Sequence, residues 1–480
     1  MRWLAAYLPA FVLDLHERGT ATAVPLAVAG GVPGREVLTA CNEAAGVRGV
    51  RAGMSRDTAH ALVPELHVVS RDEAAEAAAL RNLAAWAGQF SDVVSIEPGR
   101  GLLLESGRSL RLFGGGRRLG RLVRQGLATL GFEAWVALAP TARGSWWLAS
   151  RSRGTCIADR EALERRLRAL PLTVMALSPR VLVDLQALGL STLGDLEALP
   201  RDGLARRLGA GVLRQLDEAL GRRPEARRPH VPVPRFHAHL DLPAPVLEQQ
   251  ALLFPLRRLL LELAGMLRGR SAGVSRFRVG LDHGGGRTTA VDVGLAMADD
   301  DGERFLELLR HRLERVDLPA PVERVAVDAP ELRTMVPVTG DLFEAARVHD
   351  GRREAALLDR LAARLGDAAV CGLVPVPDHR PERAWRAVPV APGRRDVSEA
   401  PAHPLRPRWL LAEPRLVASP GEGPEALSLV GGAERIEGGW WDGHDVNRDY
   451  YVAEDRDGRR LWLYQERRPP HGWYVHGLFG

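Results

Sequence analysis

Three carboxylates beside predicted strands could be considered as ligands of a metal ion: Asp14, Glu97 and Glu105. Enzymes that transfer phosphoryl groups often hold two divalent cations, and magnesium prefers hard oxygen ligands. Asp14 lies beyond the end of its predicted strand, however, and Glu105 is eight residues from Glu97. The sequence therefore favours solvated surface carboxylates over one shared site, and a displaced triad of these three residues remains the alternative.

Arginine supplies all of the positive charge, because the chain contains 65 basic residues and no lysine. Residues 201–235 hold nine arginines against four acids, which gives this stretch a net charge of +5. The planar guanidinium fork suits phosphate, and each phosphate that is neutralised makes binding more salt-dependent. A solvated charged face is the plainer interpretation of such a run. The candidate DNA contacts are Arg201, Arg206, Arg207, Arg214, Arg222, Arg223, Arg227 and Arg228.

The cysteines and histidines give little support for any other metal site. Cys41, Cys156 and Cys371 are far apart and match no zinc-binding spacing. The histidines near the C-terminus are scattered and suggest no metal site. We therefore expect no bound metal, and magnesium would be a cofactor only if the displaced carboxylates formed a site.

Several domains must position these residues, since 480 residues exceed what one small core can organise. An α+β domain is predicted first, over about the first 165 residues. Its predicted strands are 3–13, 24–29, 36–40, 92–97, 101–105 and 133–139, and its predicted helices are 55–63, 72–89 and 117–130.

After the first domain, the predicted secondary structure changes twice along the chain. Short helices are predicted over 170–220, and a β-α-β-β-α-β unit follows over 236–330. A helix is predicted over 351–365, an extended Pro- and Arg-rich segment over 372–408, and antiparallel β-structure over 409–480. The apolar run near the N-terminus reads as a buried strand, and no run is long enough to span a membrane.

Five stretches, in order and spacing, resemble the Y-family (UmuC/DinB-like) translesion DNA polymerases. They are PLAVAG with the following LTACNEAAGVRGVRAGMSRDTAHALVPELHVV, then FSDVVSIEPGRGLLLES, ALAPTARGSWWLAS, LPLTVMALSPRVLVDLQALGLSTLGDL, and the β-α-β-β-α-β unit. The resemblance runs from residue 1 to about 330. It implies an α+β fold with palm, fingers, helical thumb and little finger, plus a β-rich C-terminal extension.

The resemblance also implies boundaries for these domains. We expect a palm with fingers at 1–165, the fingers being about 23–75. The thumb, similar to a helix-hairpin-helix, is expected at 166–228 and the little finger at 229–330. A connector at 331–350 and a partner-binding extension at 351–480 complete the chain.

The acids that the family uses to hold magnesium are largely missing. Tyr7 stands where the first strand should carry an Asp, and Pro9 occupies the following acidic position. On the later strand, Glu97 replaces the Asp and Pro98 replaces the Glu of an Asp-Glu pair. One carboxylate of the expected three survives, so we expect no catalytic residues.

The residues that would hold an incoming triphosphate are missing as well. Asn42 and Ala45 stand in place of a Tyr and an Arg of the fingers, and a phosphate-binding Lys of the palm would fall near Trp146. A chain with the Y-family pattern but without the catalytic acids resembles the ImuB group of bacterial mutasome proteins. The C-terminal tail after residue 432 also resembles the tail that is typical of that group.

That resemblance implies a cytoplasmic, nucleoid-associated adaptor in damage-induced (SOS) mutagenesis. The implied partners are primer-template or damaged DNA, the β sliding clamp, an error-prone C-family polymerase and a RecA-like ImuA protein. A slow translesion polymerase that uses Glu97 and displaced carboxylates is the enzyme alternative.

Two further motifs concern partners. TGDLF resembles a clamp-binding peptide, with Leu342 and Phe343 to fill an apolar pocket, Asp341 at the third position and Thr339 in place of the usual Gln. Tail tryptophans could form a small core or anchor a protein partner. These are Trp440, Trp441, Trp462 and Trp473.

Overall fold

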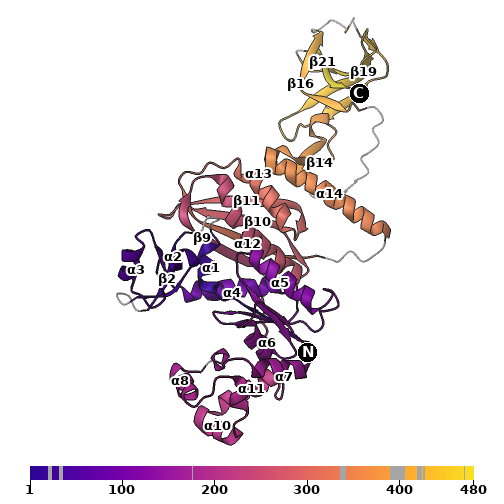
Figure 1. Cartoon of the computed structure of the whole chain (residues 1–480). Helices are drawn as coiled ribbons and strands as arrows, with labels where there is room; N and C mark the ends of the chain where they lie inside the picture. Colours follow the sequence, from indigo (N-terminus) through magenta and orange to yellow (C-terminus); the bar gives the residue numbers. More distant parts are fainter. Residues whose placement is uncertain are drawn as a thin grey trace. The chain divides into compact units, whose positions relative to one another are not determined.

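The computed structural model describes most of the chain, which forms two compact units, Met1–Arg364 and Leu365–Gly480 (Figure 1). We describe each unit by itself. The described residues are 1–19, 24–31, 36–175, 177–335, 342–389, 406–418, 424, 427–469 and 471–479, with the side chains of 342–350 and 389 left out.

A five-stranded sheet organises the first part of the chain. Its order is β5 (Val94–Glu97), β6 (Gly101–Glu105), β1 (Trp3–Tyr7), β7 (Trp135–Ala139) and β8 (Gly154–Cys156). Strand β1 is antiparallel to both β6 and β7, so its residues are buried on two faces. The strand predicted over 3–13 ends early, at Tyr7, and α1 (Phe11–Glu17) follows. Pro9 explains the difference, because proline cannot donate to a strand ladder.

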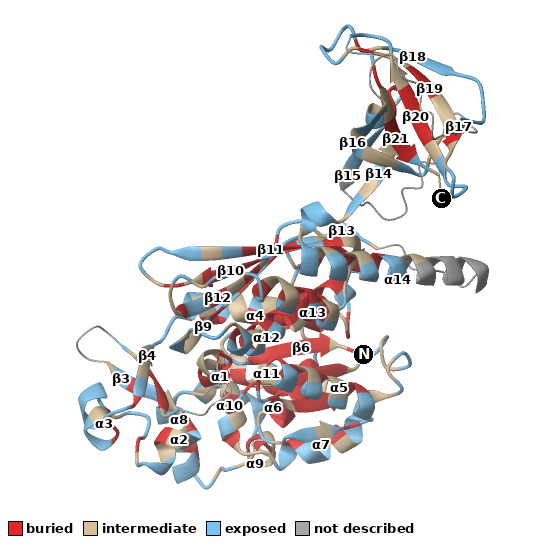
Figure 2. Cartoon of the chain, turned by 90° about the horizontal axis from the view of Figure 1, so that it is seen from above, coloured by how far each residue is buried: buried red, intermediate tan, exposed pale blue. Residues whose placement is uncertain are grey.

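Helices cover both faces of this central sheet, so that β6 is buried between them (Figure 2). On one face, α4 (Glu73–Ala87) and α5 (Gly116–Thr129) pack with α1 over Leu4 and Ala6. On the other face, α6 (Ala142–Ala149) and α7 (Arg160–Arg168) pack over Trp3 and Ala5. Side-chain caps begin three of these helices, since Asp72, Thr141 and Asp159 accept hydrogen bonds from first-turn amides.

A small three-stranded sheet with its own core follows α1 in the chain. Strands β3 (Val37–Cys41), β2 (Leu26–Gly30) and β4 (His67–Ser70) form it in that order, with α2 (Glu43–Val47) and α3 (Arg56–Leu62) packed on it. Strand β4 was not predicted from the sequence, because it has four residues, begins with a histidine and ends with a serine, and so carries little strand pattern.

Short helices follow β8, as predicted. They are η1 (Leu172–Val174), α8 (Pro179–Ala187), α9 (Leu193–Glu197), α10 (Arg201–Leu208) and α11 (Ala210–Leu220). Their apolar side chains continue the core beneath α6, and the Thr141 hydroxyl donates to the Ala219 carbonyl at 2.6 Å. This hydrogen bond ties α11 to the helix that covers the central sheet.

The predicted β-α-β-β-α-β unit is confirmed. It consists of β9 (Phe236–Val246), α12 (Gln249–Gly269), β10 (Ala272–Asp282), β11 (Thr288–Asp299), α13 (Gly302–Leu313) and β12 (Val322–Ala329). The sheet order is β11-β10-β12-β9, and β13 (Arg333–Thr334) pairs with β10. Phe277 and Phe305 meet in the core between sheet and helices.

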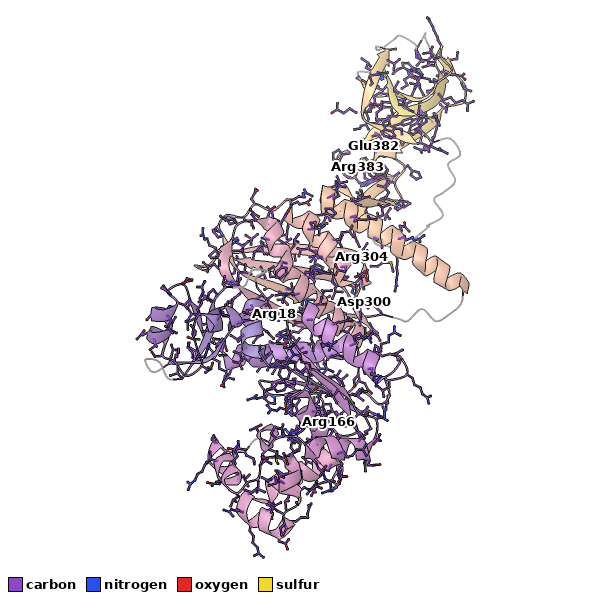
Figure 3. All side chains as sticks on the ribbon, in the orientation of Figure 1. Arg18, Arg166, Asp300, Arg304, Glu382 and Arg383 are labelled. Atoms are coloured by element: carbon purple, nitrogen blue, oxygen red, sulfur yellow. The ribbon has the colours of Figure 1, made fainter. Side chains whose placement is uncertain are left out.

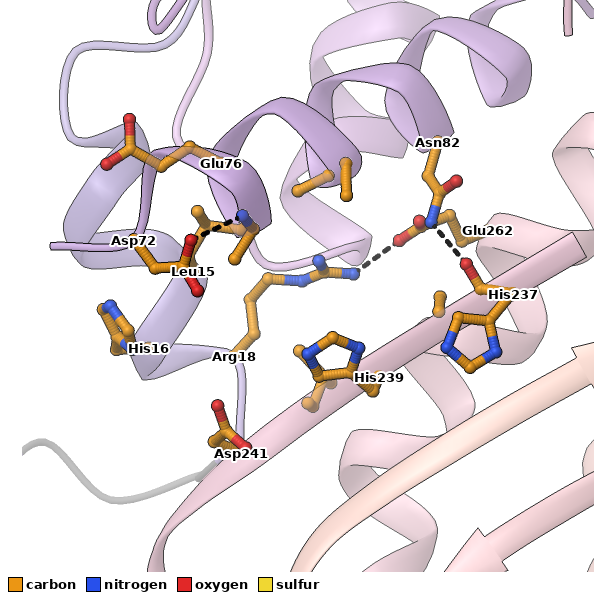
Figure 4. A pocket seen from close by; sticks show the side chains of 15 residues that line it. Leu15, His16, Arg18, Asp72, Glu76, Asn82, His237, His239, Asp241 and Glu262 are labelled. Carbon is orange, nitrogen blue, oxygen red and sulfur yellow. Dashed lines mark hydrogen bonds and ion pairs between the residues drawn. The ribbon is translucent and has the colours of Figure 1, made fainter.

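Helix α12 packs directly on α4, which joins this unit to the central sheet. Gly265 allows the approach, since a Cβ atom there would lie 2.0 Å from the indole of Trp86. Arg18 is buried at the junction (Figure 3), where it donates to Glu262 at 2.7 Å and to the Leu130 carbonyl at 2.7 Å. A pocket lies beside this ion pair, and across it Asn82 donates to the His237 carbonyl at 3.0 Å (Figure 4).

Helix α14 (Leu342–Leu365) begins nine residues before the helix that the sequence predicted at 351–365. Its later part packs on the β-α-β-β-α-β unit, where Arg304 forms ion pairs with Asp299 at 2.5 Å and with Asp359 (Figure 3). Residues 351–364 therefore belong to the first compact unit and not to the C-terminal one.

The second unit is β-rich, as predicted. After η2 (Asp367–Ala369), strands β14 (Cys371–Pro375) and β15 (Trp385–Pro389) form a hairpin around η3 (Pro381–Arg383), within the segment expected to be extended. A six-stranded sheet contains β16 (Trp409–Ala418), β17 (Ser428–Leu429), β18 (Glu434–Gly438), β19 (Val446–Glu454), β20 (Arg460–Glu466) and β21 (Trp473–Leu478). Its order is β16-β21-β20-β19-β17, and β18 pairs with the other part of β19. The expected α+β class with a β-rich end is confirmed. Among the described residues, no helix has the length and apolarity that crossing a membrane requires.

Candidate functional site

The central sheet brings Tyr7 and Glu97 to one level. Tyr7 pairs with Gly101 on β6, and Gly101 pairs with Glu97 on β5. On the other side, Tyr7 pairs with Trp135 on β7. Paired residues face the same side of a sheet, so these residues form a row across one face, the face covered by α6. Two positions that are 90 residues apart in the sequence thus lie in one row of the sheet.

Aromatic packing occupies the Tyr7 end of this row. The ring of Trp146, from α6, meets the ring of Tyr7 edge to face with centroids 5.3 Å apart, and Trp135 lies at 6.1 Å. The Tyr7 hydroxyl accepts a hydrogen bond from Arg100 at 3.0 Å. Trp146 is 9% exposed and belongs to the core. This end therefore offers apolar surface in place of oxygen ligands.

The two prolines flank the row in turns. Pro9 is exposed between β1 and α1, and Pro98 is exposed in the tight turn between β5 and β6. The backbone beside them is held by the Leu8 amide, which donates to the Arg100 carbonyl at 2.8 Å. Proline has no side-chain donor or acceptor, so neither residue can bind a metal ion or a proton.

A chain of alternating charges occupies the Glu97 end. Glu97 forms an ion pair with Arg227, and Arg227 also pairs with Glu225. Glu225 accepts in turn from Arg143 of α6 at 2.7 Å, and Arg143 lies 3.3 Å from Glu218 of α11. The surviving carboxylate is thus neutralised by a guanidinium from the segment that follows α11.

Burial makes these pairs sensitive to the loss of a partner. The side chain of Arg227 is 13% exposed and that of Glu97 is 19% exposed. Burial lowers the pKa of Arg227 to about 10 and raises the pKa of Glu225 above its ordinary value. The segment is also fixed by its backbone, because the His230 amide donates to the Val94 carbonyl at 2.6 Å.

Three members of this chain were not predicted from the sequence: Arg143, Glu218 and Glu225. In the sequence, the two acids only reduce the net charge of the basic stretch 201–235. Nothing in the sequence around Arg143 marks it as a functional residue. The available signal was that acidic and basic residues alternate over 218–227. The residues that pair with them, on α6 and β5, lie far away in the sequence.

The displaced carboxylate triad does not assemble. Glu105 pairs with Trp3, at the opposite end of β1 from Tyr7, which places it about 13 Å along the sheet from that row. Its carboxylate accepts from the Gly107 amide at 3.2 Å. Asp14 lies on α1, where it accepts from the Glu133 amide at 3.0 Å. In the part of the chain that the structure describes, no group of three or more His, Cys, Asp or Glu side chains could hold a metal ion.

Comparisons with known proteins place the chain in a family. The IMS model, described as the impB/mucB/samB family, matches residues 7–149. Protein ImuB of Caulobacter vibrioides strain NA1000 / CB15N is 31% identical over 463 residues, which cover 90% of this chain and all of that protein. The same figures hold for Protein ImuB of strain ATCC 19089 / CIP 103742 / CB 15. The chain belongs to the ImuB family.

Solved structures similar to this ImuB-family chain include a DNA polymerase and a DinB protein. The insertion ternary complex of Dbh DNA polymerase is 18% identical, covers 69% of this chain and 99% of its own, and gives a TM-score of 0.41. DinB from Sulfolobus solfataricus is also 18% identical, covers 70% of this chain and 100% of its own, and gives a TM-score of 0.39.

The pair of magnesium ions that the resemblance to polymerases implies does not fit the row in this ImuB-family chain. Two ions close together need several carboxylate oxygens. Glu97 supplies one carboxylate where three are expected, and Arg227 already neutralises it. No chemical step through magnesium can be built on Tyr7, Pro9, Glu97 and Pro98.

The positions expected to hold a triphosphate serve the fold instead. Asn42 caps α2, where its Oδ1 accepts from the amides of Ala45 at 3.0 Å and Leu26 at 3.1 Å. Its Nδ2 donates to Glu17 at 2.6 Å and to the Val24 carbonyl at 2.7 Å, so the amide is fully used. Ala45 is fully buried in the core of the small sheet. Neither side chain therefore has a free polar atom to offer a nucleotide.

The arginines predicted to contact DNA divide into two groups. Three of them hold acids of this unit: Arg201 pairs with Asp217 at 2.6 Å, Arg222 pairs with Glu164 and Glu197, and Arg227 pairs with Glu97. Arg227 is the least available of these three for DNA, because its side chain is 13% exposed and already holds Glu97 and Glu225. The other five are exposed and have no acidic partner among the described residues: Arg206, Arg207, Arg214, Arg223 and Arg228.

The tail tryptophans divide in the same way. Trp462 is 2% exposed and stacks on Tyr450 with centroids 4.1 Å apart, so it forms core and cannot anchor a partner. Trp473 is half-buried against Tyr451. Trp440 and Trp441 are 77% and 63% exposed and lie side by side in the loop between β18 and β19.

The clamp-like peptide falls mostly outside the described residues. This applies to Thr339 and Asp341, and although α14 begins at Leu342, the side chains of Leu342 and Phe343 are not described.

Proposed function

We propose that this ImuB-family chain is a Y-family polymerase homologue that binds DNA and organises a translesion synthesis complex without synthesising DNA itself. The observation that carries the proposal is the occupation of the row on the central sheet. Trp146 packs on Tyr7 at one end, and Arg227 neutralises Glu97 at the other. Two independent contacts thus fill the place where a polymerase would gather carboxylates.

The proposed domains keep most of the predicted boundaries: palm with fingers at 1–165, thumb at 166–228, little finger at 229–330 and a connector from 331. The extension was predicted at 351–480, and we propose that it begins at Leu365, because residues 351–364 pack with the first unit. The buried junction at Arg18 and Glu262 supports a frame whose parts hold one another in place. Exposed arginines of the proposed thumb, with Arg206 and Arg214 among them, are suited to the backbone of primer-template or damaged DNA.

The proposed partners are proteins that supply what this chain lacks. They are an error-prone C-family polymerase for synthesis, a RecA-like ImuA protein and the β sliding clamp, in damage-induced (SOS) mutagenesis at the nucleoid. Trp440 and Trp441 are suited to anchor a protein partner, because exposed tryptophans often dominate interfaces. The peptide Thr339–Phe343 is the proposed clamp ligand.

Primer extension tests the absence of synthesis. Purified chain is incubated with a labelled primer-template, nucleotides and either magnesium or manganese, beside a true Y-family polymerase as positive control. We expect no template-dependent extension from the wild type or from Glu97→Ala. Extension by the wild type that disappears in Glu97→Ala, while circular dichroism shows that the variant remains folded, would establish the alternative, a slow polymerase that uses Glu97.

A pull-down with the β clamp tests the adaptor role separately. The double variant Leu342→Ala/Phe343→Ala should lose clamp binding, because both apolar anchors are removed. Leu357→Ala, an exposed leucine later on α14, is the matched control and should bind like the wild type. Unchanged binding by the double variant would move the clamp contact to another segment.

A further inference from the structure

A cavity lined by arginine lies on the far side of the central sheet from Tyr7. Helix α5 and strands β7 and β8 form its walls, and its volume is about 240 Å³. Val136 and Leu138 at its floor belong to the core beneath α4 and α5, whereas Tyr7 packs against the opposite core. The cavity is therefore separate from the row described above and from the arginines of α10 and α11.

Four arginines surround this cavity: Arg117, Arg121 and Arg124 from α5, and Arg153 from the turn before β8. Arg153 lies 3.3 Å from Glu133, and both of these side chains are largely exposed. The other three have no acidic partner within the described ranges. Residues 106–132 contain six arginines and no acid, so no carboxylate is close in sequence either. Such a concentration of unpaired guanidinium groups favours an anionic ligand.

Glycines keep the cavity open. Gly116, Gly120 and Gly154 all line it. A Cβ atom on Gly116 would lie 3.1 Å from Leu138 Cδ1, and one on Gly154 would lie 3.7 Å from Arg124 Nη1. A larger residue at position 116 would therefore crowd the floor, whereas a Cβ atom at position 154 would only reach ordinary contact with the guanidinium. The remaining space accommodates a phosphate group with several waters.

The beginning of α5 adds to the positive potential. This helix has 14 residues, its N-cap Gly115 offers no side-chain hydrogen bond, and its first turn contains no acid. Free amides and the helix dipole favour an anion at that end. Arg117, Arg121 and Arg124 follow at i, i+4 and i+7, so they line one face over about 10 Å.

We propose that this cavity and the arginine face of α5 bind the phosphate backbone of single-stranded DNA, as a second contact beyond the proposed thumb. A row of three guanidinium groups over about 10 Å matches several consecutive phosphates and not one isolated anion. No aromatic side chain lines the cavity, so bases have no platform to stack on and recognition is independent of sequence.

Salt-titrated binding of the full chain to a labelled 30-nucleotide strand tests this contact. The pocket variant is Arg117→Gln/Arg121→Gln/Arg124→Gln, because glutamine keeps helix propensity. Neutralising three phosphates contributes about 2 to the slope of log affinity against log salt, and the variant should lose that amount. Strands of mixed sequence and of oligothymidine should show the same loss. If the triple variant fails to fold, Arg153→Gln alone should lower the slope by a smaller amount.

The matched control removes the same charge elsewhere, as Arg81→Gln/Arg268→Gln/Arg310→Gln. These three arginines are exposed on helices of the same unit and do not line the cavity. An equal effect of both triple variants would mean a general charge effect and would overturn the proposal.

Two more comparisons separate this inference from the proposed function. A third variant, Arg206→Gln/Arg207→Gln/Arg214→Gln, reports on the thumb. Loss of binding in that variant alone would overturn the second contact and leave the adaptor proposal standing. Competition by pyrophosphate without any change of the DNA slope in the pocket variant would assign the cavity to a free phosphate compound, which also overturns it.

Discussion

The rings of Tyr7 and Trp146 meet edge to face, with centroids 5.3 Å apart, at the end of the central strand β1. Such contacts contribute about 0.5–1.5 kcal/mol beyond the burial of area. We expect Tyr7→Ala and Trp146→Ala each to lower the free energy of unfolding, with about 3–5 kcal/mol for the buried tryptophan. A double-mutant cycle by urea unfolding should give a coupling energy in the range of an aromatic pair.

The exposed Trp440 supplies the control for that cycle. Trp440→Ala should change the free energy of unfolding by less than about 0.5 kcal/mol, because its ring is mostly in solvent. A coupling energy near zero between Tyr7 and Trp146 would show that the contact adds nothing to the packing of each ring.

The ion pair of Glu97 and Arg227 gives a second prediction. Glu97→Ala leaves a largely buried guanidinium with fewer partners, and breaking a buried pair typically costs about 3–5 kcal/mol. The double variant Glu97→Leu/Arg227→Leu should be more stable than Glu97→Ala, since it buries no unpaired charge. Thermal unfolding of the three proteins checks the order. A single variant as stable as the wild type would contradict a structural role for this pair.

Exposed and ion-paired arginines should differ in their contribution to DNA binding. Arg206→Gln/Arg207→Gln removes two exposed charges that have no acidic partner among the described residues. Arg201→Gln/Arg222→Gln removes the same charge from side chains that already hold Asp217 and Glu197. For duplex DNA, we expect the first variant to lower the salt slope by up to about 0.9 per phosphate contact and the second to lower it less. Equal slopes would show that ion pairing does not restrict these side chains.

Local pattern predicted most of the elements, and contacts between distant segments explain what it could not. The strand near Tyr7, the glutamate at the end of β5 and the β-α-β-β-α-β unit all follow from periodicity and turn residues. The neutralisation of Glu97 could not be predicted, because Arg227 is 130 residues away and its position beside β5 depends on the packing of α11 on α6. The roles of Asn42 and Trp146 were likewise hidden, since a missing ligand does not reveal what replaces it.

Asp14 gives a prediction about pH, because burial raises the pKa of its carboxyl to about 7. The nearby carboxylates of Glu17 and Glu133 act in the same direction, while the Glu133 amide and Arg18 oppose it. The folded state therefore holds this proton more tightly than the unfolded chain does. The resulting stabilisation is complete below the ordinary pKa of 3.8 and is lost as the pH rises through about 7.

Asp14→Asn removes this titration and keeps an oxygen that can accept from the Glu133 amide. Relative to Asp14→Asn, the wild type should lose about 2.5 kcal/mol of unfolding free energy between pH 5 and pH 8. Comparing the two proteins cancels the contributions of half-buried histidines such as His16, whose pKa is lowered by burial. Urea unfolding at four pH values gives the difference directly. Parallel stability curves would show that Asp14 titrates near its ordinary pKa in the folded protein.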